Sequence, residues 1–177
     1  ISDIIKEQNP SLQFDISANP EFLSRGTAVA NFLYPDRVVI GIENSAVKES
    51  YKKLYGSIYE EDKFIFTSIN SATLGKYAAN VFLATKVAFI NEMADLAEQY
   101  GADIDEIAKI MGSDDRIGNK FLKAGPGFGG SCFPKDTQAL AQMAEQAELD
   151  LPLVRSVVDS NSSRVEKIMF KIKRLLS

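Results

Sequence analysis

The sequence contains no histidine and no tryptophan, and it has one cysteine among its 177 residues. Without an imidazole group the chain cannot by itself perform Ser-His-Asp or Cys-His catalysis. One cysteine and no histidine leave little besides carboxylates to bind a metal, so we expect no metal site. Any proton transfer must therefore be carried out by lysine, aspartate, glutamate, tyrosine or cysteine side chains.

The sequence also lacks long uncharged segments and a large excess of one charge. Its longest stretch without a charged residue runs from Phe64 to Gly75, whereas a membrane-spanning helix needs about 20 apolar residues. The formal net charge of -4 gives no indication of nucleic-acid binding. A lone cysteine cannot form an internal disulfide, which is typical of a reducing compartment. We therefore expect a cytoplasmic protein with neither a membrane nor a nucleic acid as partner.

The first seventy residues alternate short strand and helix patterns. Alternating or β-branched segments predict strands at residues 13–17, 37–42 and 63–67, and helical spacing predicts a helix at 47–55 with Ser45 as its N-cap. Strands separated by helices favour a parallel α/β sheet. Three strands are too few for such a sheet, and the chain starts with a segment, Ser2 to Lys6, that is typical of a helix end. We therefore expect a piece of a longer protein.

From about Ser71 onward the patterns are helical. Apolar residues recur every three or four positions up to Gly101 and share one helix face: Ala78, Phe82, Thr85, Phe89, Met93, Leu96 and Tyr100. The first half of this helix is apolar nearly all round, so we expect it to be buried on several sides. A short helix after Asp103, one carrying Leu140 and Ala144, and a last one from Pro152 follow. The fold class predicted is an α/β remnant followed by an all-α domain.

The strongest local signal is a glycine-rich loop that ends in the single cysteine. Residues 125–136 read Gly-Pro-Gly-Phe-Gly-Gly-Ser-Cys-Phe-Pro-Lys-Asp. Glycines at this density allow close approach of the backbone to a ligand. A thiol at a helix start, with Lys135 nearby, is favoured in its thiolate form. The alternative is a buried structural cysteine, which behaves as a small apolar residue.

Two further groups are candidates for chemistry. Lys76 and Asn80 are four residues apart on an otherwise apolar helix; the lysine acts as a base or oxyanion partner, or it merely extends its ammonium group to water. Glu21 follows Asn19 and Pro20 at the end of the first predicted strand, where ligands of α/β sheets bind. The alternative for Glu21 is a solvated residue of an ordinary turn.

Taken together, these motifs resemble those of the UDP-glucose/GDP-mannose dehydrogenase family, in its order and spacing and over essentially the whole chain. The matching segments are Asn19–Leu23, Pro35–Gly41, Lys76–Asn80, Phe89–Glu92 and Gly127–Asp136. The form Gly-Gly-Ser-Cys-Phe-Pro-Lys-Asp is similar to the UDP-glucose branch of the family. The branch that acts on UDP-N-acetylmannosamine usually has a histidine before the cysteine.

The resemblance implies oxidation of a sugar CH2OH group to a carboxylate in two NAD-dependent steps. It assigns Cys132 as nucleophile, Lys76 to oxyanion stabilisation or proton transfer, and Glu21 to hydrolysis of a thioester. Asn80 and Asp136 are expected to flank the thiol and a water. The remaining residues that the resemblance implies contact substrate or cofactor: Phe22, Leu23, Arg116, Phe121, Lys123, Phe128 and Gly129 for the sugar nucleotide, and Glu21 and Lys135 for NAD.

The resemblance further implies that residues 1–70 are the C-terminal part of an NAD-binding, Rossmann-like domain, and that residues 71–177 form a central helical dimerisation domain. The glycine loop at 125–130 does not follow a predicted strand, as the family's dinucleotide fingerprint does, because a helix precedes it. We therefore expect the chain alone to be inactive. Arg116 is expected to reach the sugar-nucleotide site of the partner in a homodimer. Alternatives are oxidation of GDP-mannose, a thiol-dependent acyl transferase or aldehyde dehydrogenase, and a non-catalytic dimerisation module.

Overall fold

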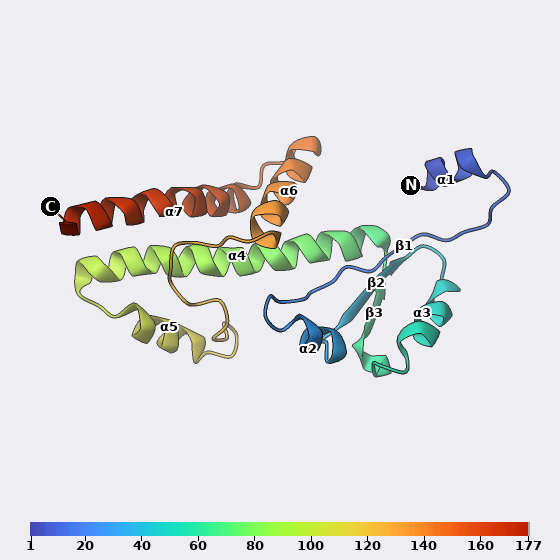
Figure 1. The fold of residues 1–177 in the computed structure, drawn as a ribbon, viewed down its shortest axis with the longest axis horizontal. Helices are drawn as coiled ribbons and strands as arrows, with labels where there is room; N and C mark the ends of the chain where they lie inside the picture. The colour runs from blue at the N-terminus through green and yellow to red at the C-terminus, as the bar shows by residue number, and fades with distance from the viewer. Residues whose placement is uncertain (177) are drawn as a thin grey trace. The chain divides into compact units, whose positions relative to one another are not determined.

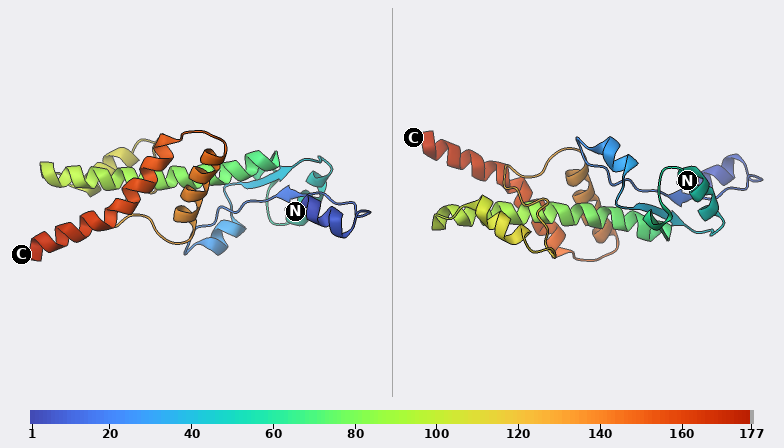
Figure 2. Two further views of the ribbon diagram at one scale, coloured as in Figure 1. Left: turned by 90° about the horizontal axis from the view of Figure 1, so that it is seen from above. Right: turned by 90° about the horizontal axis from the view of Figure 1, so that it is seen from below.

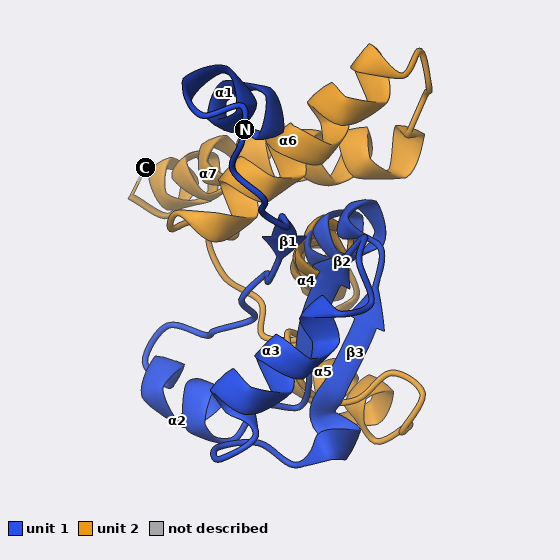
Figure 3. Cartoon of the chain, turned by 90° about the vertical axis from the view of Figure 1, so that its right-hand side faces the viewer, with its two compact units in different colours: residues 1–76 blue, residues 77–177 orange. Residues whose placement is uncertain are grey.

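A computed structural model of the chain describes residues 1–176 (Figure 1). The chain divides into two compact units, residues 1–76 and residues 77–177 (Figure 3). Helix α4 (Ile69–Tyr100) begins in the first unit and continues in the second. Each unit has a hydrophobic core of its own.

The first unit contains a three-stranded sheet in the order β1-β2-β3. Its elements are α1 (Ser2–Gln8), β1 (Ser17–Ala18), α2 (Ala28–Leu33), β2 (Val38–Ile42), α3 (Val47–Tyr55), a 3-10 turn (Glu61–Lys63) and β3 (Phe64–Thr67). The strands predicted at 37–42 and 63–67 and the helix predicted at 47–55 are confirmed. Their signals are local: a β-branched segment for β2, and tyrosines at helical spacing for α3.

Strand β2 lies at the centre of this unit. Val38 and Ile40 are buried and pack with Tyr59 and the rings of Tyr51 and Tyr55. A side chain at Gly41 would lie 2.7 Å from the Cα atom of Ile69 and 2.8 Å from the Cβ atom of Ala72. Glycine is therefore required at this point of β2, because the first turn of α4 packs directly against the strand.

The sheet is not purely parallel, which corrects the prediction. Strands β2 and β3 are parallel, but β1 pairs with β2 in the antiparallel direction, with Ser17 opposite Ile42. The strand expected at 13–17 is wrong as well, because only Ser17 and Ala18 pair. A parallel pairing needs a crossover that packs on the sheet, whereas α2 has six residues and none of them is buried.

The N-cap predicted for α3 is also wrong. Ala46, not Ser45, is the N-cap residue, and no side chain caps the helix through it. Instead, the side chain of Asn44 accepts a hydrogen bond from the Ala46 N–H at 3.0 Å, a turn that precedes the helix. Asparagine often forms such a turn because its short side-chain amide reaches the backbone N–H two residues further along the chain.

The second unit is helical. It contains the rest of α4, then α5 (Ile104–Gly112), α6 (Cys132–Gln146) and α7 (Pro152–Leu176), and α7 crosses α4 obliquely (Figure 2). Helix α5 begins as predicted, since the Asp103 side chain accepts hydrogen bonds from the N–H groups of Asp105 and Glu106. Among the described residues, no helix is long and apolar enough to cross a membrane.

The expectation that the first half of α4 is buried on several sides is only partly correct. The face with the large apolar residues is exposed in the single chain: Phe82 is 66% and Phe89 45% exposed. The buried face consists largely of alanines, among them Ala84 and Ala88, which form the core of the unit together with Val157. The alanine face is the buried one because small side chains let α7 and the glycine loop approach the helix closely.

Candidate active site

The single cysteine lies at the start of α6. Cys132 is the first residue of the helix, after the N-cap Ser131, and its thiol is free and exposed. The Ser131 Oγ atom is 3.6 Å from Sγ. An exposed thiol at a helix N-terminus, where the peptide dipoles favour negative charge, does not fit a buried structural cysteine.

A buried carboxylate follows one turn later. Asp136 is 2% exposed, and its two oxygens accept different donors: Oδ2 accepts from Asn80 Nδ2 at 2.6 Å, and Oδ1 accepts from Lys135 Nζ at 2.6 Å. The structure thus brings together Asn80 and Asp136, which are 56 residues apart in sequence. Because a buried carboxylate is costly unless it is hydrogen-bonded, this pairing fixes Asp136 beside the start of α6.

Lys135 remains a cation next to the cysteine. Its hydrogen bond to Asp136, and then the charge of that carboxylate, raise the pKa of Lys135 above its ordinary value, with a smaller contribution from Cys132. The side chain is 68% exposed. Its ammonium group is therefore available to an anionic group as well as to Asp136.

The glycine loop before Cys132 is fixed by aromatic packing. Phe133 contacts Phe121 with ring centroids 5.9 Å apart, and Phe128 edge-on at 5.8 Å. Phe128 and Phe133 also pack against the core of the second unit. Phe121 has a positive φ of 64°, a conformation that is rare for a bulky residue and usually marks a functional constraint. Gly129 and Lys123 are exposed.

Arg116 lies in a turn after α5 and is highly exposed, with 89% of its side chain accessible. Its guanidinium forms a fork with the Asp114 carboxylate, through Nη2 at 2.6 Å and Nε at 3.0 Å. This hydrogen bonding raises the pKa of Arg116 and lowers the pKa of Asp114. Lys86 on α4 holds the same turn by donating to the carbonyl oxygens of Ile117 and Gly118.

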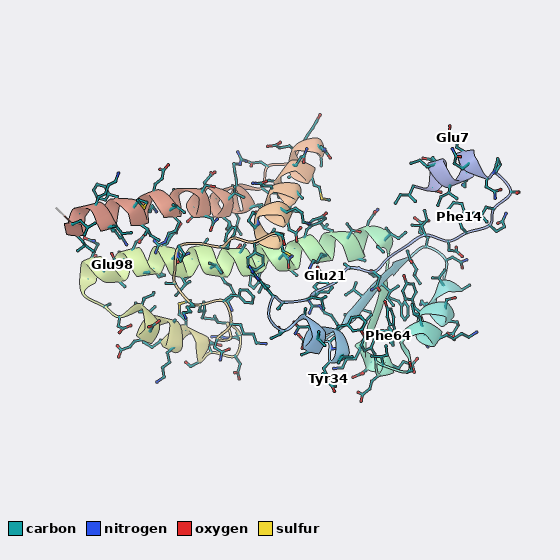
Figure 4. The ribbon with its side chains drawn as sticks, viewed as in Figure 1. Glu7, Phe14, Glu21, Tyr34, Phe64 and Glu98 are labelled. Carbon is teal, nitrogen blue, oxygen red and sulfur yellow. The ribbon has the colours of Figure 1, made fainter. Side chains whose placement is uncertain are left out.

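In the first unit, four of the predicted residues form a second group. Lys76 donates to Glu21 at 3.4 Å, and its ammonium lies 5.0 Å from the centre of the Phe22 ring. The Arg37 guanidinium lies over the same ring at 4.0 Å. Glu21, labelled in Figure 4, also accepts the N–H of Leu23 at 2.6 Å. Lys76 is only 15% exposed, so its stem is packed while its charge is shared between carboxylate and ring.

Sequence reasoning missed the residues that hold the glycine loop. Asn91 on α4 and Asn161 and Arg164 on α7 bind the backbone of Gly125 and Phe128. One signal could have revealed two of them. Asn91 and Asn161 are polar residues whose neighbours at helical spacing are mostly apolar, which is costly unless the polar group has a buried partner; Arg164 has mostly polar neighbours and gives no such signal.

Comparison with known proteins gives these features a context. The model of the UDP-glucose/GDP-mannose dehydrogenase central domain matches residues 70–163, and the model of the NAD binding domain of the same family matches residues 1–59. The chain belongs to this family. The resemblance stated from the motifs is therefore confirmed, and the fold, a small sheet with helices followed by a helical unit, is that of a dehydrogenase of the family.

Individual members of the family are similar over nearly the whole chain. A UDP-glucose 6-dehydrogenase of Rickettsia felis is 47% identical over 170 residues, which cover 96% of this chain and 38% of the relative. The structure of a UDP-glucose dehydrogenase from Pyrobaculum islandicum matches with a TM-score of 0.87 at 36% identity, over 91% of this chain and 37% of that one. A GDP-mannose dehydrogenase from Pseudomonas aeruginosa matches less well, with a TM-score of 0.61 at 29% identity, over 97% of this chain and 40% of that one.

The chain thus spans two fifths or less of the length of these family members. Its residues fit NAD in part. The exposed ammonium group of Lys135 beside the cysteine suits an anionic cofactor. The half-exposed carboxylate of Glu21 can accept hydrogen bonds from hydroxyl groups. The loop before α6 has the spacing Gly-x-Gly-x-x-Gly at Gly125, Gly127 and Gly130, but it follows α5, whereas the turn that holds a dinucleotide pyrophosphate follows a β-strand.

Proposed function

We propose that this chain is the part of an NAD-dependent UDP-glucose 6-dehydrogenase that carries the catalytic cysteine, and that the enzyme converts UDP-glucose to UDP-glucuronate. The observation that carries the proposal is the exposed Cys132 at the first residue of α6, one turn before the buried Asp136 with its Asn80 partner. The 47% identity to a relative named UDP-glucose 6-dehydrogenase supports the substrate.

The proposed reaction removes two hydrides, and bound NAD supplies the oxidising power by accepting one hydride in each step. In the first step the sugar CH2OH loses a hydride and a proton and becomes an aldehyde. Lys76 stabilises the negative charge on the sugar oxygen or takes part in moving the proton. This role suits a largely buried lysine whose ammonium group forms an ion pair with Glu21.

Cys132 then forms the covalent intermediate. Its sulfur adds to the aldehyde carbon, and the aldehyde oxygen takes up a proton, which gives a thiohemiacetal. Loss of the second hydride and of that proton converts it to a thioester. Water attacks the thioester carbon, the C–S bond breaks, and the carboxylate and the free thiol are released. We assign Asp136 and Asn80 to holding this water, and Glu21 to assisting its attack.

We assign residues to the sugar nucleotide in each unit, taken by itself. In the second unit, the exposed cations Lys123 and Arg116 suit the diphosphate, while Phe121, Phe128 and Gly129 border the start of α6. In the first unit, we assign Phe22 and Leu23 to the substrate. Arg116 is assigned to the partner's sugar-nucleotide site, because in its own chain it extends into solvent on a fixed turn.

The direct test uses a chimaera in which residues 1–177 replace the matching segment of the Rickettsia felis relative. With UDP-glucose, the chimaera is expected to form two NADH for each UDP-glucuronate. Turnover of GDP-mannose at a similar rate would contradict the assigned substrate, and turnover of simple aldehydes but not of UDP-glucose would indicate an unrelated aldehyde dehydrogenase.

We also propose that the chain forms a homodimer through α4. The exposed face of this helix carries large apolar residues at one side, which are Phe82, Phe89, Leu96 and Tyr100. A face of this kind usually marks an interface. In a two-fold dimer the same face meets itself.

The dimer is tested by sedimentation. The chain is expected to sediment with twice the mass of one 19.5 kDa chain. Phe89→Asp should convert it to a monomer without loss of helix content, because Phe89 is 45% exposed in the single chain and its replacement leaves the core intact. The control Ile110→Asp places the same charge on an exposed apolar position of α5 and should leave the dimer unchanged. A wild-type chain that is monomeric at high micromolar concentration contradicts the proposal.

A further inference from the structure

One side-chain amide binds both backbone groups of a residue in the glycine loop. Asn161 Oδ1 accepts the N–H of Phe128 at 2.7 Å, and Asn161 Nδ2 donates to the carbonyl oxygen of the same residue at 3.0 Å. A primary amide is the side-chain group that offers a donor and an acceptor side by side. Gly127, with φ of 105°, makes room for it, because a Cβ atom there would lie 2.6 Å from Asn161 Oδ1.

The loop is bound in the same way three residues earlier. The N–H of Gly125 donates to Asn91 Oδ1 at 2.8 Å, and its carbonyl oxygen accepts from Arg164 Nε at 3.0 Å. Asn91 and Arg164 are 4% and 7% exposed, and Arg164 is itself oriented by Asp95 at 2.5 Å. At each end of the four-residue segment 125–128, the N–H and the carbonyl group are thus bound by side chains of α4 and α7, of which Asn91 and Arg164 are buried and Asn161 is half-buried.

These contacts have no role in the chemistry proposed above, because none of the three side chains binds Cys132, Asp136 or Asn80 in the structure. They act on the loop that leads to the thiol. Only residues 129–131 separate Phe128 from Cys132, and the Phe128 ring packs edge-on against Phe133. A fixed Phe128 therefore limits where α6 can begin.

We propose that Asn161 is a positioning residue for Cys132: its amide fixes the glycine loop and so holds the thiol at the N-terminus of α6. Asn91 and Arg164 fix the other end of the same loop. The functional meaning of this placement rests on the proposed role of Cys132, but the placement itself can be measured without any activity.

The test compares Asn161→Ala with Ser162→Ala, which removes an exposed hydroxyl from the same turn of α7. Because Cys132 is the one cysteine of the chain, alkylation by iodoacetamide reports on this thiol alone. Hydrogen exchange of the Phe128 amide reports on the loop, and circular dichroism with thermal unfolding reports on the fold.

In Asn161→Ala, Phe128 exchange is expected to accelerate about tenfold, as for the loss of two hydrogen bonds. Alkylation of Cys132 at pH 7 is expected to slow about threefold, because a frayed first turn of α6 no longer holds the sulfur at the helix N-terminus. Ser162→Ala should change neither. If Asn161→Ala does not fold, Asn161→Asp, which keeps the acceptor but not the donor, should show both changes in weaker form.

Two results overturn the proposal. Unchanged exchange at Phe128 would mean that the amide does not hold the loop, and faster exchange with alkylation at the wild-type rate would mean that the loop does not position the thiol. Neither result depends on whether Cys132 is the nucleophile. If the chimaera lacking this thiol stayed active, the proposed function would fail while the placement measured here could still hold.

Discussion

Replacing Cys132 by serine in the chimaera is expected to lower the turnover of UDP-glucose to UDP-glucuronate at least about a thousandfold, as for loss of a nucleophile. A hydroxyl at this position is a much weaker nucleophile than a thiol. Binding of UDP-glucose should be largely retained, since the exposed thiol is replaced by a group of similar size.

Steady-state formation of NADH and calorimetric titration with UDP-glucose measure the two expectations for Cys132→Ser. The control is Ser131→Ala, which removes the hydroxyl that lies 3.6 Å from the sulfur but leaves the thiol; it should change turnover by less than about tenfold, the range of a single hydrogen bond. Near wild-type turnover in Cys132→Ser would exclude the cysteine as nucleophile and would favour a dimerisation module with an incidental thiol.

The largest effect on stability is expected at Asp95, where α4 meets α7. Asp95 accepts hydrogen bonds from Arg164 at 2.5 Å and from Lys171 at 2.8 Å, and Lys171 also binds Glu98, which Figure 4 labels near the end of α4. Only 8% of the Arg164 side chain is exposed. Asp95→Asn would leave this buried cation without its carboxylate.

We expect Asp95→Asn to lower the free energy of unfolding by about 2–3 kcal/mol at pH 7, which is below the full cost of breaking a buried pair because 27% of Asp95 reaches solvent. Urea unfolding of the chain measures this. The control Glu98→Gln removes a contact whose carboxylate is 56% exposed, and should cost about 0.5 kcal/mol or less. Equal effects of the two variants would contradict the buried role of Asp95.

The effect of Asp95→Asn is expected to depend on pH. Burial raises the pKa of Asp95, but hydrogen bonds from Lys171 and Arg164 outweigh it, so that the pKa lies below its ordinary value. A depressed pKa adds stability above the pKa of the unfolded chain, and this stability is lost as the pH falls through the lower, folded value. The difference between Asp95→Asn and the wild-type chain should therefore be full at pH 7 and shrink below about pH 4.

The parts of the fold that the sequence predicted are those with local signals. Asp103 marks the start of α5 because its carboxylate reaches the N–H groups of the next turn, and β2 is a β-branched segment buried in its sheet. The direction of β1 has no such signal. It depends on how the connection through α2 folds back, and two residues of pairing leave no pattern to read.

The buried face of α4 could not be predicted for a different reason. A helix that is apolar nearly all round has several faces that could be buried, and the choice is made by what packs against it. In the single chain, α7 and the glycine loop pack against the alanine face of α4, around Ala84 and Ala88. Phe82 and Phe89 on the other side remain exposed.

The candidate site was predictable where its residues are close in sequence. Cys132 and Asp136 are one turn apart, and the glycines before them mark an unusual backbone. The residues that bind this loop were not predictable as such, because Asn161 and Arg164 act on backbone groups of Gly125 and Phe128. A backbone partner leaves no trace in sequence. For Asn161 the sign is a polar residue in an apolar helix stripe, and for Arg164 there is no such sign.

The measurement that tests the proposed role of Cys132 most directly is the mass of the cysteine peptide during turnover. The chimaera with Glu21→Gln, which is expected to hydrolyse the thioester slowly, is mixed with UDP-glucose and NAD, quenched in acid and digested. The account predicts that the peptide containing Cys132 gains the mass of a glucuronyl nucleotide bound as a thioester, which hydroxylamine removes, and that Cys132→Ser gains nothing. Product formation without any hydroxylamine-sensitive adduct on Cys132, in a variant that turns over slowly, would contradict it.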